Sequence, residues 1–345
     1  MDEPLHVLVF GAGSIGTYIG GSLALLGHPV VFLERPEVAA ELNQRGLRLK
    51  LGGVQKVILD AAIVASIDEA VALGPFDVAI FALKSFDTQP ALESLASYTG
   101  SLPPVLCLSN GVENEPTLAR AWGADKVIAG TVTSAVGRLA AGDIVLERLR
   151  GMGVAGGHPL SNRLVAALDS AGLNARLFAN AASMKWSKLL TNLLANASSA
   201  ILDMPPAEIF AHPGLYMLEV RQLHEALAVM RAQGLQEVDL PSTPVRLLAF
   251  AVRSLPPHLS RPFLQRAVGG GRGGKMPSFY IDLHSGRGQS EVDYLNGAVV
   301  RGGQRLGIPT PANRLLNDTL LALTAGKLPP GAFSNQPEKL LQLLK

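Results

Sequence analysis

The stretch that decides the fold, Val7–Gly27, reads VLVFGAGSIGTYIGGSLALLG, an apolar strand-like run that passes through spaced glycines into a helical pattern. Gly11 allows a tight turn, Gly13 lets a pyrophosphate approach the backbone, and Gly16 lets the helix pack closely on the strand. The first turn of such a helix presents N–H groups and a partial positive charge to phosphates. The stretch therefore predicts a dinucleotide site. Its predicted contacts are Gly11, Ala12, Gly13, Ser14, Ile15 and Gly16.

A membrane span and a signal peptide both fit this uncharged stretch less well than a dinucleotide site does. Its glycines and hydroxyl residues make a poor lipid-facing helix, although its length is sufficient for a membrane span. The chain opens with Met1-Asp2-Glu3-Pro4, without the basic segment of a signal peptide. We therefore predict neither a span nor a signal peptide here.

Composition favours an enzyme with two domains. A chain of 345 residues corresponds to about two domains, and a net charge of +2 does not indicate a nucleic-acid or membrane-surface partner. The single Cys107 lies in an apolar run and is predicted to be an inert strand residue, so a cytoplasmic location is expected. The histidines lack metal-binding spacing, and no protein-bound metal is predicted.

The first half alternates short apolar runs with amphipathic stretches, which is typical of βαβ units and a parallel sheet. Two later strands, Asp143–Glu147 and Asn174–Phe178, are predicted as antiparallel additions at the edge of that sheet. The other predicted strands are His6–Phe10, Val30–Leu33, Asp77–Leu83, Val105–Ser109 and Lys126–Ala129. The predicted helices are Ser14–Leu26, Pro36–Arg45 and Pro116–Ala121.

The helical period dominates from about Ala179 onward. We predict a dinucleotide-binding domain of residues 1–178 and an all-helical domain of residues 179–345, with a long first helix and a ligand site between the domains. An apolar helical domain is also compatible with a homodimer. The segment Gly269–Gly274 is predicted to be a flexible loop and a candidate lid. The predicted helices are Ala181–Leu202, Leu215–Gln233, Pro244–Val252, Ser278–Ser285, Val292–Leu306 and Ala312–Ala325.

One helical segment carries a polar face suited to acid–base chemistry. Lys188, Asn192 and Asn196 recur every four residues and share one face of the predicted helix. Apolar surroundings disfavour a charged lysine, so the pKa of Lys188 is expected to fall toward the range useful for proton transfer. The two amides can hold hydroxyl or carboxylate oxygens. A solvated polar stripe has the same spacing, and the nearby dinucleotide site favours the catalytic interpretation.

Further polar residues lie where ligands are expected. Lys84 and Asn110 follow successive apolar strands, and ligands of open α/β sheets bind at the carboxyl ends of strands. Asn110 begins an Asn-Gly pair that is also compatible with a simple turn. Ser278 and Asp282 share a helix face, and Glu291 opens the next helix, where an acid can also serve as a cap.

Together these motifs resemble the ketopantoate reductase (2-dehydropantoate 2-reductase) family over nearly the whole chain. The resemblance implies a Rossmann-type domain followed by an all-α domain like the C-terminal domain of 6-phosphogluconate dehydrogenase. It also implies NADPH-dependent reduction of ketopantoate to (R)-pantoate, in pantothenate and coenzyme A biosynthesis. It rests on GAGSIG, the Lys84 strand end, NGVENE at Asn110–Glu115, WxKLxxNxxxN from Trp186 to Asn196, and the ending SxxxD…EVDYLNG.

The family implies a role for each matching residue. Lys188 would protonate the ketone oxygen as hydride arrives, and Glu291 would contact the cofactor and the reacting centre. Lys84, Asn110 and the Val136 backbone would line the nicotinamide side. Hydride addition builds negative charge on the ketone oxygen, which a cation and amide donors stabilise. The predicted substrate contacts are Asn110, Lys188, Asn192, Asn196, Ser278 and Asp282.

Departures from the family leave the cofactor and the substrate open. Arg35 matches the family residue that meets the 2′-phosphate, which favours NADP. Glu34 lies 18 residues after Gly16, where an acid binds the ribose of NAD, so NAD also remains possible. Pro206 replaces a family asparagine, and the segment between Asp282 and Glu291 is one residue longer. Reduction of another 2-keto acid or an imine therefore remains an alternative, as does a non-catalytic NADP sensor.

Overall fold

The computed structural model describes residues 3–272 and 276–344, and gives only the backbone of residues 263 and 266–272. The chain forms two compact units, whose boundary falls within helix α7 (Ala181–Leu193) after Lys185. No helix in the described ranges is long and apolar enough to span a membrane. The first unit contains Met1–Ser109, Glu113–Lys185 and Leu240–Thr243, and the second contains Asn110–Val112, Trp186–Asp239 and Pro244–Lys345.

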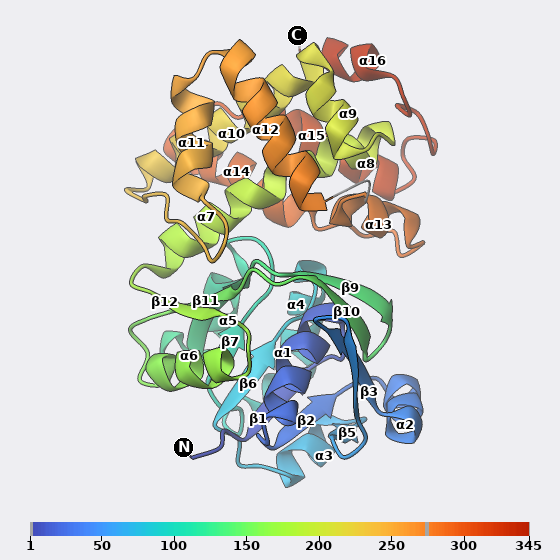
Figure 1. Cartoon of the computed structure of the whole chain (residues 1–345), viewed down its shortest axis with the longest axis vertical. Helices are drawn as coiled ribbons and strands as arrows, with labels where there is room; N and C mark the ends of the chain where they lie inside the picture. The colour runs from blue at the N-terminus through green and yellow to red at the C-terminus, as the bar shows by residue number, and fades with distance from the viewer. Residues whose placement is uncertain (1–2, 273–275, 345) are drawn as a thin grey trace. The chain divides into compact units, whose positions relative to one another are not determined.

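The first unit is α/β and is built on an eight-stranded sheet with the order β12-β11-β8-β7-β6-β1-β2-β5 (Figure 1). The strands from β8 to β5 in that order are parallel, whereas β11 pairs antiparallel with β8, and β12 pairs parallel with β11. The prediction of an added edge strand near Asn174–Phe178 is therefore confirmed. The strands are β1 (Val7–Phe10), β2 (Val30–Leu33), β5 (Ala62–Val64), β6 (Val78–Phe81), β7 (Val105–Cys107), β8 (Val127–Val132), β11 (Met152–Ala155) and β12 (Ala175–Phe178).

A second sheet has the order β4-β3-β10-β9, with β4 (Val54–Ile58), β3 (Leu47–Leu51), β10 (Asp143–Arg148) and β9 (Ala135–Ala140). The prediction that Asp143–Glu147 joins the edge of the main sheet is wrong, because β10 pairs with β9 and β3 instead. The physical reason is that the second sheet has only one apolar face. Residues of β3 alternate between buried and exposed, whereas β1 of the main sheet is buried on both faces. The apolar face of the second sheet must therefore pack against another element.

Helix α1 (Ser14–Leu25) provides that cover and lies between the two sheets (Figure 1). It is buried from Gly16 to Leu23, because one side contacts β1 and β2 and the other contacts β3, β9 and β10. A Cβ at Gly20 would lie 2.7 Å from the Val9 side chain, and one at Gly21 would lie 2.8 Å from that of Leu49. Glycines in this helix therefore serve close packing on both sides.

The remaining helices of the first unit cover the two faces of the main sheet. Alternate residues of β1 enter different cores: Val7 and Val9 belong to one, and Leu8 and Phe10 to the other. Both faces of β1 are therefore buried, as expected for a central parallel strand. These helices are α2 (Pro36–Arg45), α3 (Ile67–Ala72), α4 (Thr88–Ser94), α5 (Asn114–Trp122) and α6 (Ser161–Ser170), with 3₁₀ turns at Ser85–Asp87, Ala96–Tyr98 and Ala124–Lys126.

The second unit is helical where it is described. Helix α12 (Pro257–Arg272) includes residues 269–272, so the predicted loop Gly269–Gly274 is wrong there, and Gly273 and Gly274 lie outside the described residues. Glycine lowers helix propensity without forbidding the helical conformation. The other helices are α8 (Asn196–Leu202), α9 (Pro206–Ala211), α10 (Pro213–Ala232), α11 (Val245–Ser254), α13 (Ser278–His284), α14 (Val292–Leu306), α15 (Pro311–Thr324) and α16 (Pro337–Gln342).

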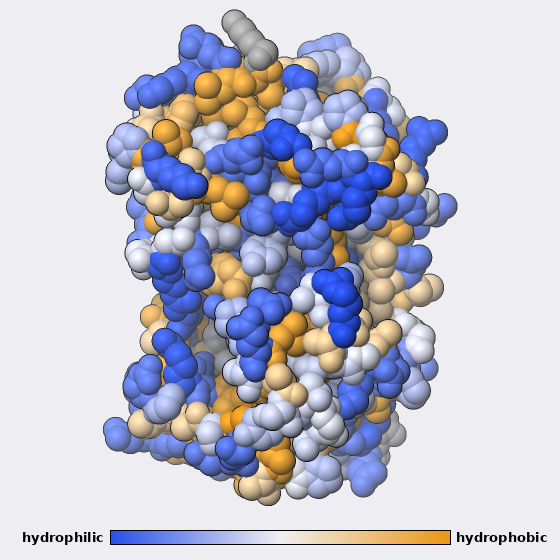
Figure 2. All heavy atoms as spheres, turned by 180° about the vertical axis from the view of Figure 1, so that it is seen from behind, coloured by the Kyte–Doolittle hydropathy of each residue, from blue (hydrophilic) through white to orange (hydrophobic). Residues whose placement is uncertain are grey.

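The surface seen from behind is hydrophilic over much of its area, with apolar patches between the polar side chains (Figure 2). Single exposed apolar side chains occur in both units, for example Val54 in the first and Phe250 in the second. Such scattered exposure is normal for globular proteins and by itself identifies no binding surface.

The predicted long helix Ala181–Leu202 is in fact two helices, α7 and α8, separated at Ala195, whose φ of 49° is left-handed. Glu219 of α10, fully buried, accepts hydrogen bonds from Ala195 N–H (2.7 Å) and Ser198 Oγ (2.6 Å). Gln222 donates to the Leu193 carbonyl (3.3 Å). Groups from α10 thus replace the helical hydrogen bonds lost at the break.

We predict that Glu219→Ala lowers the free energy of unfolding by about 2–4 kcal/mol, because it leaves buried donors without an acceptor. Urea denaturation followed by circular dichroism measures the loss. Glu208→Ala, on an exposed position of α9, is the matched control and should change stability by less than about 0.5 kcal/mol. Equal stability of the two variants would show that Glu219 does not hold the break.

Candidate functional site

The glycine-rich loop has the geometry that each glycine was predicted to provide. Gly11 follows β1 with a φ of +86°, in the left-handed region that favours glycine. A Cβ at Gly16 would lie 2.1 Å from the Gly11 carbonyl oxygen, so α1 can start here only because residue 16 has no side chain. A Cβ at Gly13 would meet nothing within 4 Å. The fold needs glycine at positions 11 and 16, whereas position 13 borders open space.

The N-terminus of α1 is suited to an anion. No side chain caps it, and its first turn contains no acidic residue. The loop is fixed through Ala12, whose N–H donates to Glu34 Oε1 (2.5 Å) and whose carbonyl accepts from Gly142 N–H (2.8 Å). A held loop, an uncapped helix end and open space at Gly13 fit the pyrophosphate of a dinucleotide.

Glu34 and Arg35 lie directly after β2, beside this loop. The Glu34 backbone N–H donates to the Val64 carbonyl of β5 (3.0 Å), which anchors the residue at the end of the sheet. Its carboxylate also accepts from Arg35 N–H (3.1 Å). The Arg35 guanidinium is largely exposed and lies 4.0 Å from the Glu37 carboxylate. Both predicted cofactor residues are therefore next to the loop, with the carboxylate closer to it.

Lys84 and Val136 are also in the first unit. Lys84 follows β6, and the side chain of the preceding Leu83 lies beside Gly11, 3.2 Å from where a Cβ would stand. Ser109 Oγ donates to the Leu83 carbonyl (2.8 Å) and so joins the ends of β6 and β7. Val136 lies in β9, opposite Leu146 of β10. The carboxyl-end position predicted for Lys84 is thus present.

In the second unit, Asn192 Nδ2 of α7 donates to Asn110 Oδ1 (3.1 Å). Lys188, half-buried, lies one turn earlier on the same helix. Gly111, with a φ of +86°, is more than a turn residue, because a Cβ there would stand 2.6 Å from the Tyr294 carbonyl oxygen of α14. The segment with Asn110 is therefore held between α7 and the first turn of α14.

The side-chain amide of Asn196 makes hydrogen bonds to other groups of the protein. Its Nδ2 donates to the Asn192 carbonyl (3.1 Å) and to Ser278 Oγ (3.3 Å), and its Oδ1 accepts from Phe279 N–H (3.1 Å). Its amide therefore ties α7, α8 and the start of α13 together. Ser278 is exposed, and accepting this bond leaves its hydroxyl hydrogen able to donate to a ligand. Of these two predicted substrate contacts, Asn196 has the geometry of a positioning residue.

The two predicted acids of the second unit are buried. Asp282 lies in α13 with 9% exposure, one turn after Ser278. Glu291 is the N-cap residue of α14 with 1% exposure, but its side chain makes no capping hydrogen bond. A capping role therefore does not explain the presence of Glu291.

Sequence reasoning missed Lys185, which is 4% exposed. Its Nζ donates to the carbonyls of Ser109 (2.6 Å) and Gly130 (3.2 Å) and pairs with Glu115 (2.7 Å). It thus anchors the beginning of α7 to the ends of β7 and β8. Burial, together with the Glu115 carboxylate, raises the pKa of the Cys107 thiol. A buried thiol in β7 that stays protonated agrees with the inert strand residue that was predicted.

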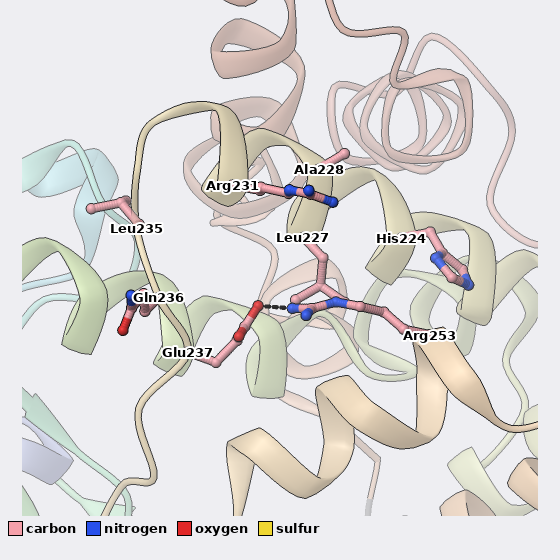
Figure 3. Close-up of a pocket in the computed structure, with 8 residues that line it drawn as sticks. All are labelled: His224, Leu227, Ala228, Arg231, Leu235, Gln236, Glu237 and Arg253. Carbon is pink, nitrogen blue, oxygen red and sulfur yellow. Dashed lines mark ion pairs between the residues drawn. The ribbon is translucent and has the colours of Figure 1, made fainter.

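A separate pocket of about 410 Å³ lies in the second unit between α10, α11 and the segment that joins them (Figure 3). It contains an ion pair between Arg253 and Glu237, drawn as a dashed line. None of the residues predicted from the sequence lines it. The lining residues are His224, Leu227, Ala228, Arg231, Leu235, Gln236, Glu237 and Arg253.

Comparisons with known proteins cover both units. The family model described as ketopantoate reductase PanE/ApbA matches residues 7–156, and that of its C-terminal domain matches residues 180–324. The 2-dehydropantoate 2-reductase of Archaeoglobus fulgidus is 25% identical over 93% of this chain and 98% of its own length. That of Halobacterium salinarum is 29% identical over 91% and 97%.

Solved structures share the fold. A PanE/ApbA family ketopantoate reductase from Ralstonia eutropha superimposes with a TM-score of 0.78 at 28% identity, over 93% of this chain and 99% of the other. D-Mandelate dehydrogenase in a ternary structure with NADH and anilino(oxo)acetate gives a TM-score of 0.74 at 21% identity, over 93% and 98%. The second likeness concerns the fold alone.

The open space at Gly13 gives a testable prediction. Gly13→Ala should leave the free energy of unfolding within about 0.5 kcal/mol of the original protein, because its Cβ meets no neighbour. It should weaken NAD(P)H binding at least about tenfold, because the methyl group occupies the approach of the pyrophosphate. Fluorescence titration measures the affinity. Gly100→Ala, also without neighbours within 4 Å, should change neither quantity, and unaltered binding by Gly13→Ala would contradict the site.

Proposed function

Because this chain belongs to the ketopantoate reductase family, we propose that it reduces the 2-keto group of ketopantoate to (R)-pantoate with a reduced nicotinamide dinucleotide. The family resemblance favours NADPH as that dinucleotide. The bound dinucleotide supplies a hydride to the keto carbon. The first unit supplies its binding loop, and the second supplies the groups that act on the keto acid.

The observation that carries this proposal is the group of Lys188, Asn192 and Asn110 in the second unit. The two amides are hydrogen-bonded at 3.1 Å, and Lys188 precedes Asn192 by one turn on α7. An ammonium group and an amide on one face of α7, with the Asn110 amide hydrogen-bonded to the latter, suit an oxygen that gains negative charge. Lys188 Nζ gives a proton to that oxygen as the carbon receives hydride, and the alkoxide becomes a hydroxyl.

The other polar groups of this unit hold the substrate. The Ser278 hydroxyl donates to an oxygen of the acid, while Asn196 fixes the start of α13 and hence the position of Ser278. Glu291 is buried at the start of α14, whose first turn also contacts Gly111. We assign its carboxylate to the reacting centre, as the family resemblance implies.

A second candidate is reduction of a different 2-keto acid. Pro206 is the first residue of α9 and is buried. It supplies no side-chain donor where the family has an asparagine, so one contact to a pantoate hydroxyl is lost. D-Mandelate dehydrogenase, which shares the fold, is by its name an enzyme of another 2-hydroxy acid. A panel of 2-keto acids with and without a 4-hydroxyl group separates the two candidates.

The biological setting is part of the same proposal. We place the enzyme in the cytoplasm, in pantothenate and coenzyme A biosynthesis, with a small-molecule substrate. A homodimer stays a prediction. An imine reductase and a non-catalytic NADP sensor are the remaining alternatives, and a sensor has no need of the amide pair beside Lys188.

Lys188→Ala tests the proposal. Loss of the proton donor should lower kcat for ketopantoate by about 10²–10⁴-fold, while the Kd of the dinucleotide stays within about twofold, since Lys188 is not among the predicted dinucleotide contacts. Stopped-flow absorbance at the reduced nicotinamide band measures turnover. Lys327→Ala, on an exposed position, is the control. Undiminished turnover in Lys188→Ala would remove its catalytic role, and an unmutated protein that binds dinucleotide without turnover would favour the sensor.

A further inference from the structure

The Glu34 carboxylate is fixed at the edge of the glycine-rich loop by two backbone donors. Ala12 N–H reaches Oε1 at 2.5 Å, and Arg35 N–H reaches Oε2 at 3.1 Å. One donor lies in the loop and the other at the end of β2, so the two oxygens are oriented by different elements. Glu34 is therefore a preorganised negative charge next to the dinucleotide loop.

This carboxylate still has acceptor capacity for a ligand. An ionised carboxylate offers about four lone-pair positions, and each Glu34 oxygen uses one for a backbone N–H. One position remains on each oxygen, which matches the two adjacent hydroxyl groups of an unmodified ribose. A ribose with a 2′-phosphate offers no 2′-hydroxyl donor and brings about two negative charges to the same place.

The nearby Arg35 guanidinium does not cancel the repulsion between the Glu34 carboxylate and a 2′-phosphate. The Arg35 side chain is 65% exposed and already faces the Glu37 carboxylate at 4.0 Å, which is itself 72% exposed. An exposed arginine with an acidic neighbour is well solvated, and its attraction for a phosphate is screened. The carboxylate is the anchored group of the pair, and the guanidinium is not held against the loop.

We propose that Glu34 makes this protein select NADH over NADPH by binding the 2′- and 3′-hydroxyl groups of the adenosine ribose. The inference rests on the dinucleotide site of the proposed function and replaces NADPH, which the family resemblance favours, as its cofactor. Repulsion between like charges about 5 Å apart at an effective dielectric near 20 corresponds to at least about a tenfold difference in Kd.

The experiment is isothermal titration of the ligand-free protein with NADH and, separately, with NADPH, without keto acid. The original protein should bind NADH at least about tenfold more tightly. Glu34→Gln keeps the size but removes the charge and should reduce the ratio of the two Kd values at least about tenfold. Glu41→Gln removes a carboxylate from the exposed side of α2, where it pairs with Arg45, and should leave the ratio unchanged.

Equal or tighter binding of NADPH by the original protein would overturn the proposal, as would an unchanged ratio in Glu34→Gln. Thermal melting checks that the variant is folded, and Glu34→Ser provides a second uncharged variant if it is not. The titrations contain no substrate, so their outcome is independent of the reaction. Efficient turnover by an enzyme that prefers NADPH would refute the selection of NADH by Glu34 and leave the proposed reductase activity intact. Tight and selective NADH binding without turnover would support the selection by Glu34 and contradict the reductase activity.

Discussion

The close approach of helix α1 to strand β1 is the constraint on which the first unit depends. The Gly11 carbonyl oxygen lies so near Gly16 that a Cβ there would stand only 2.1 Å away. This contact places the N-terminus of α1 at the carboxyl edge of the main sheet. The same helix is covered on its other side by β3, β9 and β10, so its position is fixed from two directions. The end of the helix that we propose for phosphate binding is therefore held by contacts on both sides of α1.

The arrangement of helices in the second unit depends on a helix break that a buried carboxylate stabilises. Glu219 accepts the Ala195 N–H at the point where α7 ends and α8 begins. The break lets Asn196 turn its amide toward the start of α13 instead of continuing the polar stripe of α7. Lys188 and Asn192 stay on α7. The polar groups assigned to the keto acid thus come from two helices whose relation is set by hydrogen bonds.

The sequence predicted those parts of the fold that are determined by residues close to one another in the chain. The glycine spacing and the apolar runs predicted β1, α1 and β2, and amphipathic periodicity predicted Val292–Leu306, which coincides with α14. It did not predict the second sheet, since nothing local in Asp143–Glu147 says which strands will be its partners. The break at Ala195 was also missed, because its cause is a residue of α10 that lies more than twenty positions away in the sequence.

In the candidate site, too, some features follow from residue type and spacing, whereas others depend on packing. Residue types and spacing identified Glu34, Asn110 and Lys188 as candidates. They were not sufficient to distinguish Lys185, a buried anchor, from Lys188, since both lie in the same helical stretch and only packing separates them. Nor did the sequence show that the Asn196 amide is occupied by protein partners. Burial and hydrogen-bond direction, which depend on distant residues, decide both questions.

The most direct test of the proposed activity is the value of kcat/KM for ketopantoate at a saturating concentration of NADH or NADPH. A ketopantoate reductase should oxidise the dinucleotide in a ketopantoate-dependent reaction at about 10⁴ M⁻¹ s⁻¹ or faster. Absence of such oxidation with both dinucleotides, in protein that binds either of them, would contradict the assignment of ketopantoate as the substrate.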